Sequence, residues 1–191
     1  LPEASRDDFM EDPTTWETID TDDIDPHFAD KLVDAGVDRI RTCIQCGTCS
    51  AVCPSGRRTA FRTREIIRKA VLGLKEEVVS SPDLWLCTTC FACLERCPRQ
   101  IKVTEAIVIL RNMAVEEGFM LPQHRKTSQK LLTTGHAVPI DRVNHKMRKD
   151  LGLQELPPTT HSNEKALEDV KKIMERTGFR TLVEGEAKEE A

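Results

Sequence analysis

The chain has 191 residues, of which 39% are apolar, 4% aromatic and 31% charged, with no tyrosine. This length allows one compact domain with extensions, but so few aromatic side chains are a thin supply for a large apolar core, and we expect something else to help hold the fold. The net charge of −4 at pH 7 is mild and indicates neither a nucleic-acid partner nor an anionic membrane surface.

The N-terminal residues, Leu-Pro-Glu-Ala-Ser-Arg-Asp-Asp, contain no apolar stretch that resembles a signal peptide. The most apolar short run, Ala106 to Leu110, is far shorter than the ~18 residues that span a bilayer. We therefore expect a cytoplasmic protein with no membrane span. Cysteines are normally reduced in that compartment, so grouped cysteines are expected to bind metal rather than to form disulfides.

The first elements follow an acidic segment. Residues 1–24 carry nine acidic side chains and little periodicity, and we interpret them as an extended acidic arm. Asp25 and Pro26 predict the N-cap and first position of a helix that stops at Gly36. Apolar periodicity then predicts helices over residues 63–73 and 103–118, each ending near a glycine. Ser81 and Pro82 predict another helix start.

The last third of the chain contains no cysteine. Residues 121–134 predict a helix that ends at Gly135. After a proline-rich break, Ser162 is expected to cap a final helix whose apolar stripe is formed by Leu167, Val170 and Met174. Strand signals are weak, so the prediction is a mainly α protein with three parts: the acidic arm (1–24), a helical two-cluster domain (25–118) and a helical C-terminal extension (119–191). The acidic end of this extension, residues 184–191, is predicted to be disordered.

An internal repeat lies between these helices. Each copy reads Cys-x2-Cys-x2-Cys-x3-Cys-Pro and is followed by a predicted helix, which indicates two cysteine-loop and helix units related by a pseudo-twofold axis. The second copy is displaced from the first by 44 residues. The first copy contains Cys43, Cys46, Cys49 and Cys53, and the second contains Cys87, Cys90, Cys93 and Cys97.

This spacing is a known ligand pattern for [4Fe–4S] clusters, in which the fourth cysteine binds the other cluster. Three cysteines at three-residue spacing can surround one face of a cube, whereas the fourth is expected at the start of the next helix, where the proline directs the chain away. The pattern predicts two [4Fe–4S] clusters with crossed ligands. The first is held by Cys43, Cys46, Cys49 and Cys97, and the second by Cys87, Cys90, Cys93 and Cys53.

The crossing also predicts that the clusters are close. Cys49 and Cys53 are roughly 6 Å apart if helical, which puts the cluster centres on the order of 12 Å apart. Structural zinc favours two paired Cys-x2-Cys units, which this pattern does not match. We also expect Ile44, Trp85 and Phe91 to lie in the core, where they would shield the clusters from water.

No catalytic constellation is visible in the sequence. There is no dinucleotide-binding or phosphate-binding glycine motif and no evident nucleophile with its base. With all eight cysteines assigned to saturated clusters, we expect the chain to have no catalytic residues. It is instead expected to transfer single electrons as one subunit of a larger oxidoreductase.

The two motifs, Cys-Ile-Gln-Cys-Gly-Thr-Cys-Ser-Ala-Val-Cys-Pro and Cys-Thr-Thr-Cys-Phe-Ala-Cys-Leu-Glu-Arg-Cys-Pro, resemble those of HdrC, the iron–sulfur protein of heterodisulfide reductase. The chain length, the helical spacer and the tail sequences at 151–158 and 177–179 are also similar. The resemblance extends from about residue 25 over most of the chain.

This resemblance implies an all-helical ferredoxin fold and a place in the CoB–CoM heterodisulfide reductase of methanogenic archaea. HdrA would be the flavoprotein that bifurcates electrons, and HdrB the catalytic subunit that reduces the disulfide of coenzymes M and B. The chain would relay electrons from HdrA to HdrB, in a complex fed by a hydrogenase or formate dehydrogenase module. The absence of adjacent cysteines agrees with the relay role rather than with the catalytic subunit.

Two alternatives stay open at this point. The chain could be the iron–sulfur subunit of another oxidoreductase, of the succinate/fumarate or glycerol-3-phosphate dehydrogenase type, although it lacks the plant-type Cys-x4-Cys-x2-Cys motif expected in the former. It could also be an assembly scaffold in which the clusters are purely structural.

Overall fold

The computed structural model describes residues 19–185, so most of the predicted acidic arm and residues 186–191 lie outside the described part. Within residues 19–185 every regular element is helical, which confirms the mainly α prediction. The α-helices are α1 (Phe28–Asp34), α2 (Thr48–Ala51), α3 (Thr63–Leu72), α4 (Lys75–Val79), α5 (Ala92–Arg96), α6 (Val103–Glu116), α7 (Pro122–Thr134), α8 (Arg142–Asp150), α9 (Glu164–Arg176) and α10 (Phe179–Glu184). Short 3-10 turns are η3 (Thr21–Asp23), η4 (Ile40–Thr42), η5 (Pro82–Leu86) and η6 (Thr160–Ser162).

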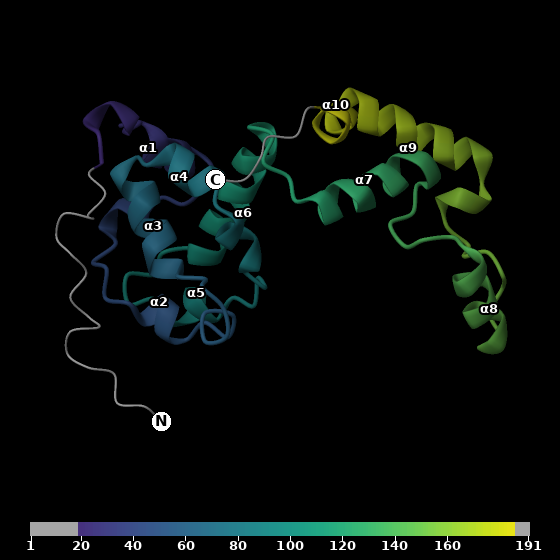
Figure 1. Cartoon of the computed structure of the whole chain (residues 1–191), viewed down its shortest axis with the longest axis horizontal. Helices are drawn as coiled ribbons and strands as arrows, with labels where there is room; N and C mark the ends of the chain where they lie inside the picture. Colours follow the sequence, from purple (N-terminus) through teal and green to yellow (C-terminus); the bar gives the residue numbers. More distant parts are fainter. Residues whose placement is uncertain (1–18, 186–191) are drawn as a thin grey trace, which may run out of the picture.

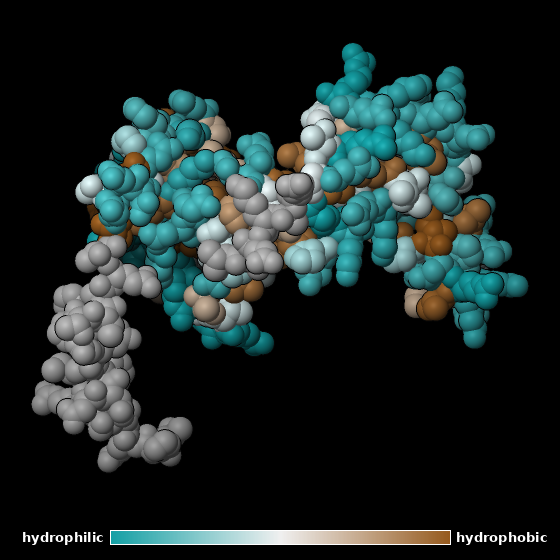
Figure 2. Space-filling view, turned by 45° about the horizontal axis from the view of Figure 1, so that its top comes forward, coloured by the Kyte–Doolittle hydropathy of each residue, from teal (hydrophilic) through white to brown (hydrophobic). Residues whose placement is uncertain are grey.

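The molecule has two lobes (Figure 1). Helices α1 to α6 form the first lobe, and α7 to α10 extend from it, with α8 at the far end. The visible surface of both lobes is mostly hydrophilic, with a concentration of apolar side chains near that far end (Figure 2). The exact division of the chain into domains stays a prediction.

The first lobe repeats one arrangement twice. In the first half, α1 precedes η4, α2 and α3; in the second half, α4 precedes η5, α5 and α6. Helix α1 packs against α3 as α4 packs against α6, while α2 packs against α5 across the two halves. This order is the pseudo-twofold repeat that the cysteine spacing predicts.

The core of this lobe is built from both halves. Phe28, Leu32 and Ile67 from the first half are fully buried with Ile107 and Leu110 from α6. Cys53 belongs to this core, and five more of the eight cysteines are partly buried against it. The apolar core of the lobe therefore packs against the cysteine loops and supports them.

The predicted helix ends are confirmed where glycine ends the helix. Gly73 follows α3 in the left-handed conformation with φ of +85°, which favours glycine. A Cβ atom at this position would also overlap the carbonyl oxygen of Asp25, and that residue's N–H donates to the Gly73 carbonyl (2.9 Å). The end of α3 is thus fixed to the segment that precedes α1.

Three predicted helix starts were wrong in detail. Helix α1 begins at Phe28, and Pro26 lies in a turn, because the Asp25 side chain accepts the His27 N–H (2.9 Å) before the helix begins. Ser81 precedes a 3-10 turn and makes no side-chain cap. The cap of α9 is Asn163 rather than Ser162, since its Oδ1 accepts the Ala166 N–H (3.1 Å).

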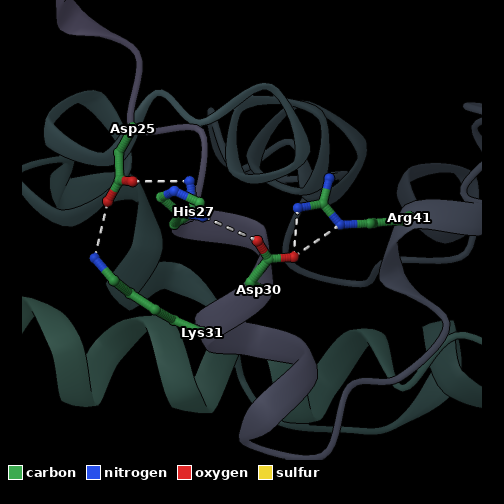
Figure 3. A network of polar contacts seen from close by, with 5 residues as sticks. All are labelled: Asp25, His27, Asp30, Lys31 and Arg41. Atoms are coloured by element: carbon green, nitrogen blue, oxygen red, sulfur yellow. Dashed lines mark hydrogen bonds and ion pairs between the residues drawn. The ribbon is translucent and has the colours of Figure 1, made fainter.

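A polar network connects α1 to the turn that leads into the first cysteine loop (Figure 3). The Asp30 carboxylate accepts hydrogen bonds from Nη2 (2.6 Å) and Nε (3.2 Å) of Arg41, two residues before Cys43. Lys31 donates to Asp25 (2.8 Å) at the start of the same network. These hydrogen bonds lower the pKa of both carboxyl groups. The network therefore orients the approach to the first loop.

The second lobe is held together by α7, α9 and α10. Met174 of the predicted stripe and Val183 of α10 are buried, with Leu167 and Val170 partly buried. Arg125 of α7 donates to the carbonyl of Val183 (2.6 Å). The stripe prediction is confirmed, whereas α8 and α10 of this lobe, like α2, α4 and α5 of the first lobe, were not predicted. Helix α10 includes Glu184, which the sequence assigned to the disordered end.

Candidate metal centre

The two cysteine loops share one backbone conformation. In the first loop, Gln45 and Gly47 have φ of 56° and 81°; at the equivalent positions of the second loop, Thr89 and Phe91 have φ of 50° and 63°. A left-handed conformation costs a residue with a side chain roughly 1–2 kcal/mol. Such residues, placed among right-handed ones, turn successive N–H groups toward one concave side, as in anion-binding nests. The strain indicates that the loops are shaped for something they enclose.

The first loop lines a recess with a cysteine from the second motif. Three of its cysteine side chains come from the first copy of the motif: Cys43, Cys46 and Cys49. The fourth is Cys97, not Cys53. The recess is small, with a volume of about 20 Å³, and is partly open to solvent. The structure thus brings together the four residues that the sequence assigns to the first cluster.

The segment that follows Cys53 lies beside the start of the second motif. Ser55, two residues later, donates its hydroxyl to the carbonyl of Leu86 (2.7 Å), the residue before Cys87. The Sγ of Cys53 accepts the N–H of Gly56 (3.4 Å). These contacts hold the segment that follows Cys53 beside the start of the second motif.

Cys97 has an equivalent local environment. Its Sγ accepts the N–H of Ile101 (3.4 Å). Cys97 ends α5, and Cys53 follows α2 by two residues, so neither stands at the start of the next helix as predicted. Pro54 and Pro98 lie in turns that direct the chain away. Loops of nine and five residues separate Cys53 and Cys97 from α3 and α6, and the pattern alone did not show them.

Other sulfur atoms have polar neighbours. The Gln45 amide donates to Cys43 Sγ (3.3 Å), and Thr48 Oγ1 is 3.4 Å from Cys46 Sγ. In the second half, Thr104 Oγ1 is 3.2 Å from Cys93 Sγ. Hydrogen bonds to ligand sulfur are one of the means by which a protein sets a cluster's reduction potential.

The two inner thiols resist ionisation without a metal. Burial raises the pKa of Cys49 to about 11 and also raises that of Cys93. By contrast, the hydrogen bond from Thr48 lowers the pKa of the exposed Cys46. Since the thiolate is the metal ligand, the buried positions require a strong local positive charge, which iron would supply.

Arg111 contacts the start of the second cysteine motif, a role that was not predicted from the sequence. Its partly buried guanidinium donates to the carbonyls of Leu84 (3.0 Å) and Cys87 (2.6 Å). It also lies 5.6 Å from the centre of the Trp85 ring. Burial lowers the pKa of Arg111, but an arginine stays charged in proteins. The sequence did offer one indication of this role, because Arg111 is a charged residue that directly follows the apolar run of α6.

The predicted shielding residues differ in their positions. Trp85 is partly buried against the core, and its ring meets His124 of α7 edge-on at 4.9 Å. Ile44 and Phe91 are 61% and 48% exposed, so their assignment to the core was wrong. Both lie in the strained loops, close in sequence to the exposed Cys46 and Cys90.

The donor set agrees with iron–sulfur clusters. As the side chains stand in residues 19–185, no group of three or more His, Cys, Asp and Glu is placed to hold a single metal ion. The cysteines instead surround a recess with thiol donors alone, and such donors suit iron–sulfur clusters. The residues present therefore fit the two clusters predicted from the sequence.

The repeat, the two cysteine motifs and the helical scaffold define a dicluster iron–sulfur protein of the all-helical ferredoxin type. Residues 39–101 match the family described as "4Fe-4S dicluster domain". Similarity to known proteins over most of the chain identifies the family more specifically. The chain belongs to the HdrC family of heterodisulfide reductases, as three relatives show.

The chain is 51% identical over 160 residues to the HdrC of the H(2):CoB-CoM heterodisulfide,ferredoxin reductase of Methanothermobacter marburgensis, covering 84% of this chain and 86% of that protein. It is 48% identical over 154 residues to the HdrC of the Ferredoxin/F(420)H(2)-dependent CoB-CoM heterodisulfide reductase of Methanosarcina acetivorans, covering 80% and 94%. It is 40% identical over 170 residues to an HdrC of the H(2)/formate:CoB-CoM heterodisulfide,ferredoxin reductase of Methanococcus maripaludis, covering 85% and 92%. The resemblance read from the motifs is confirmed.

Among residues 19–185, none of the helices combines the length and the apolar character needed to cross a membrane.

Proposed function

We propose that the chain is the electron-transfer subunit of a CoB–CoM heterodisulfide reductase in methanogenesis, relaying single electrons from HdrA to HdrB without an active site of its own. The observation that carries this proposal is the recess in which three cysteines of one motif meet Cys97 of the other. When bound, two [4Fe–4S] clusters would supply one-electron donors and acceptors.

The crossed ligand sets are the structural part of the proposal. Cys97 in the first recess supports the set Cys43, Cys46, Cys49 and Cys97. The Ser55 hydrogen bond to Leu86 supports the set Cys87, Cys90, Cys93 and Cys53. With each set drawn from both halves, ligand binding would fix α2 against α5 and would stabilise a lobe that has few aromatic side chains.

The chain's own residues would give each cluster a buried and an exposed side. Cys49 and Cys93 are partly buried and lie near enough for their charges to interact, so they would face each other across the two halves. Cys46 and Cys90 are exposed and would mark where electrons enter and leave. This arrangement supports a relay rather than a substrate site.

The partner assignment rests on the relatives. Their names describe subunits of heterodisulfide reductases that use H2, formate, ferredoxin or F420H2. We propose HdrA and HdrB as direct partners, with a hydrogenase or formate dehydrogenase module in the complete complex. Family membership favours this assignment over a succinate/fumarate or glycerol-3-phosphate dehydrogenase subunit.

Four single serine variants test the crossed ligands by EPR of the reduced protein. Cys46→Ser and Cys90→Ser provide the reference spectra for damage to the first and the second cluster. Cys53→Ser should then reproduce the Cys90→Ser spectrum, and Cys97→Ser should reproduce the Cys46→Ser spectrum. The opposite pairing, Cys53→Ser with Cys46→Ser, would refute the crossed assignment.

The relay itself is tested in the assembled complex. Single-turnover experiments should show both clusters reduced and reoxidised no more slowly than the heterodisulfide is consumed. A complex carrying Cys90→Ser should lose turnover from the physiological donor while HdrB still accepts electrons from an artificial dye. Clusters that cannot be reduced reversibly would instead support the scaffold alternative.

A further inference from the structure

The second lobe carries an apolar surface that no proposed role uses. Thirteen large apolar side chains are exposed in the described residues, and six of them lie between positions 138 and 156. These six are Val138, Val143, Met147, Leu151, Leu153 and Leu156. Figure 2 shows apolar side chains gathered over the far end of the second lobe. A concentration of this kind is typical of an interaction site.

Helix α8 organises this surface. Val143, Met147 and Leu151 follow one another at four-residue intervals along the helix and just past its end, and they are 68%, 55% and 70% exposed. Four-residue spacing places them on one face. Met147 and Leu151 line two adjacent hollows, so this apolar row is the ridge between them.

The two hollows differ in character. One is bordered by a polar row that contains Arg142 and Lys146 and ends at Asp150. The other is lined mainly by apolar residues from the loops on either side of α8, including Val138 and Leu153. The surface therefore combines an apolar centre with a polar border on one side, which is the usual anatomy of a protein interface.

Two polar atoms in the second hollow are also unsatisfied. His145 Nε2 and Thr159 Oγ1 are buried, and neither has a hydrogen-bond partner within residues 19–185. Both residues line that hollow. An unpaired buried polar atom is costly, and a partner's polar side chain entering the hollow could pair with them.

Charge indicates the kind of partner. Four of the nine residues of α8 are Arg or Lys, and one is Asp, although the whole chain has a net charge of −4. A second copy of the chain on a twofold axis would place these cations opposite themselves. The complementary surface is instead an apolar strip bordered by carboxylates.

We infer that the face of α8 formed by Val143, Met147 and Leu151 docks another subunit of the reductase complex, which presents an apolar strip bordered by Asp and Glu. This inference rests on the proposed function, because it takes the chain to be one subunit of a complex. The α8 face lies at the end of the molecule away from the cysteine loops (Figure 1). Docking at this face would therefore use a different part of the molecule from electron transfer.

The test uses the complex purified through a tag on this chain. Met147→Asp should weaken association at least about tenfold, equivalent to 1.4 kcal/mol, and should reduce the copurified subunits accordingly. Ile173→Asp is the matched control, since Ile173 is a similarly exposed apolar residue (59%) on α9, and it should leave the complex intact. Lys146→Glu should weaken association most at low salt.

Two further readouts separate this inference from the proposed function. The EPR spectrum and the reduction potentials of both clusters should be the same in Met147→Asp and wild type. A loss of docking is thereby distinguished from a defect in the electron relay, which would change the cluster signals. A photoreactive residue at position 147 should crosslink to a different subunit of the purified complex, at a segment rich in carboxylates.

The inference is overturned by an intact complex in both Met147→Asp and Lys146→Glu. It is also overturned by a crosslink from position 147 to residues 1–18 of the same chain, which are acidic as well, or to a second copy of the chain.

Discussion

Replacing Arg111 should affect both stability and one cluster. Its guanidinium makes two hydrogen bonds to backbone carbonyls, and a bond from a charged donor contributes about 1.5–3 kcal/mol. Stacking over Trp85 adds about 0.5–1 kcal/mol. Because the side chain is only partly buried, the lower value applies to each hydrogen bond, and methionine is expected to keep most of the contact with the Trp85 ring. Arg111→Met should therefore lose about 3 kcal/mol, the contribution of the two hydrogen bonds. For a chain of this size, that loss corresponds to a fall in Tm of about 6–12 °C.

Arg111→Lys separates charge from geometry. Lysine keeps the positive charge but cannot reproduce the two-pronged hydrogen bonding of arginine, so its Tm should fall by about half as much. The guanidinium lies against the carbonyl of Cys87, and a nearby cation stabilises the reduced, more negative state of a cluster. The second-motif cluster should therefore have a lower reduction potential in Arg111→Met and a nearly normal one in Arg111→Lys.

Anaerobic circular dichroism gives the Tm, and EPR-monitored redox titration gives the two potentials. Arg68→Met, on the exposed side of α3, removes the same charge away from these carbonyls and should change neither measurement appreciably. If Arg111→Met lowers the Tm but leaves the second-motif potential equal to that of wild type, the electrostatic part of the reasoning is wrong.

Three further outcomes are expected. Gly73→Ala should lose more stability in urea unfolding than Gly36→Ala, because both glycines have positive φ but only Gly73 faces a carbonyl oxygen; equal losses would contradict the clash. Asp30→Asn should be less stable than wild type at pH 7, and the gap should close as pH falls below ~4. The sign follows because the lowered pKa stabilises the fold only while the carboxylate is ionised. Removing iron anaerobically should make the loops between α2 and α6 sensitive to protease before the second lobe.

The first lobe was largely predictable because its signals are repeated and local. The cysteine spacing, the apolar periodicity of α3 and α6 and the glycine after α3 all agree with the structure. Helices α2, α4, α5 and α10 were missed because four to six residues carry too little periodicity. Helix α8 was missed for a different reason, since its apolar row faces outward and its other residues are polar.

The details of the cysteine loops depend on tertiary structure. Positive φ at Gly47 was readable from the residue type, but the same conformation at Thr89 and Phe91 was not, because a residue with a side chain normally avoids it. The exposure of Phe91 follows from that backbone. Arg111 was also beyond the pattern, since its role depends on carbonyls 24 and 27 residues earlier in the chain.

The shared backbone of the two loops has a consequence for the surfaces that the protein presents. Gln45 and Gly47 in one half correspond to Thr89 and Phe91 in the other, yet the φ values agree within about 20°. The same loop shape therefore accommodates different side chains. One half presents a bare glycine where the other presents a half-exposed aromatic ring, so two loops of the same backbone shape offer neighbouring molecules different surfaces. A symmetric scaffold acquires polarity in this way without any change of fold.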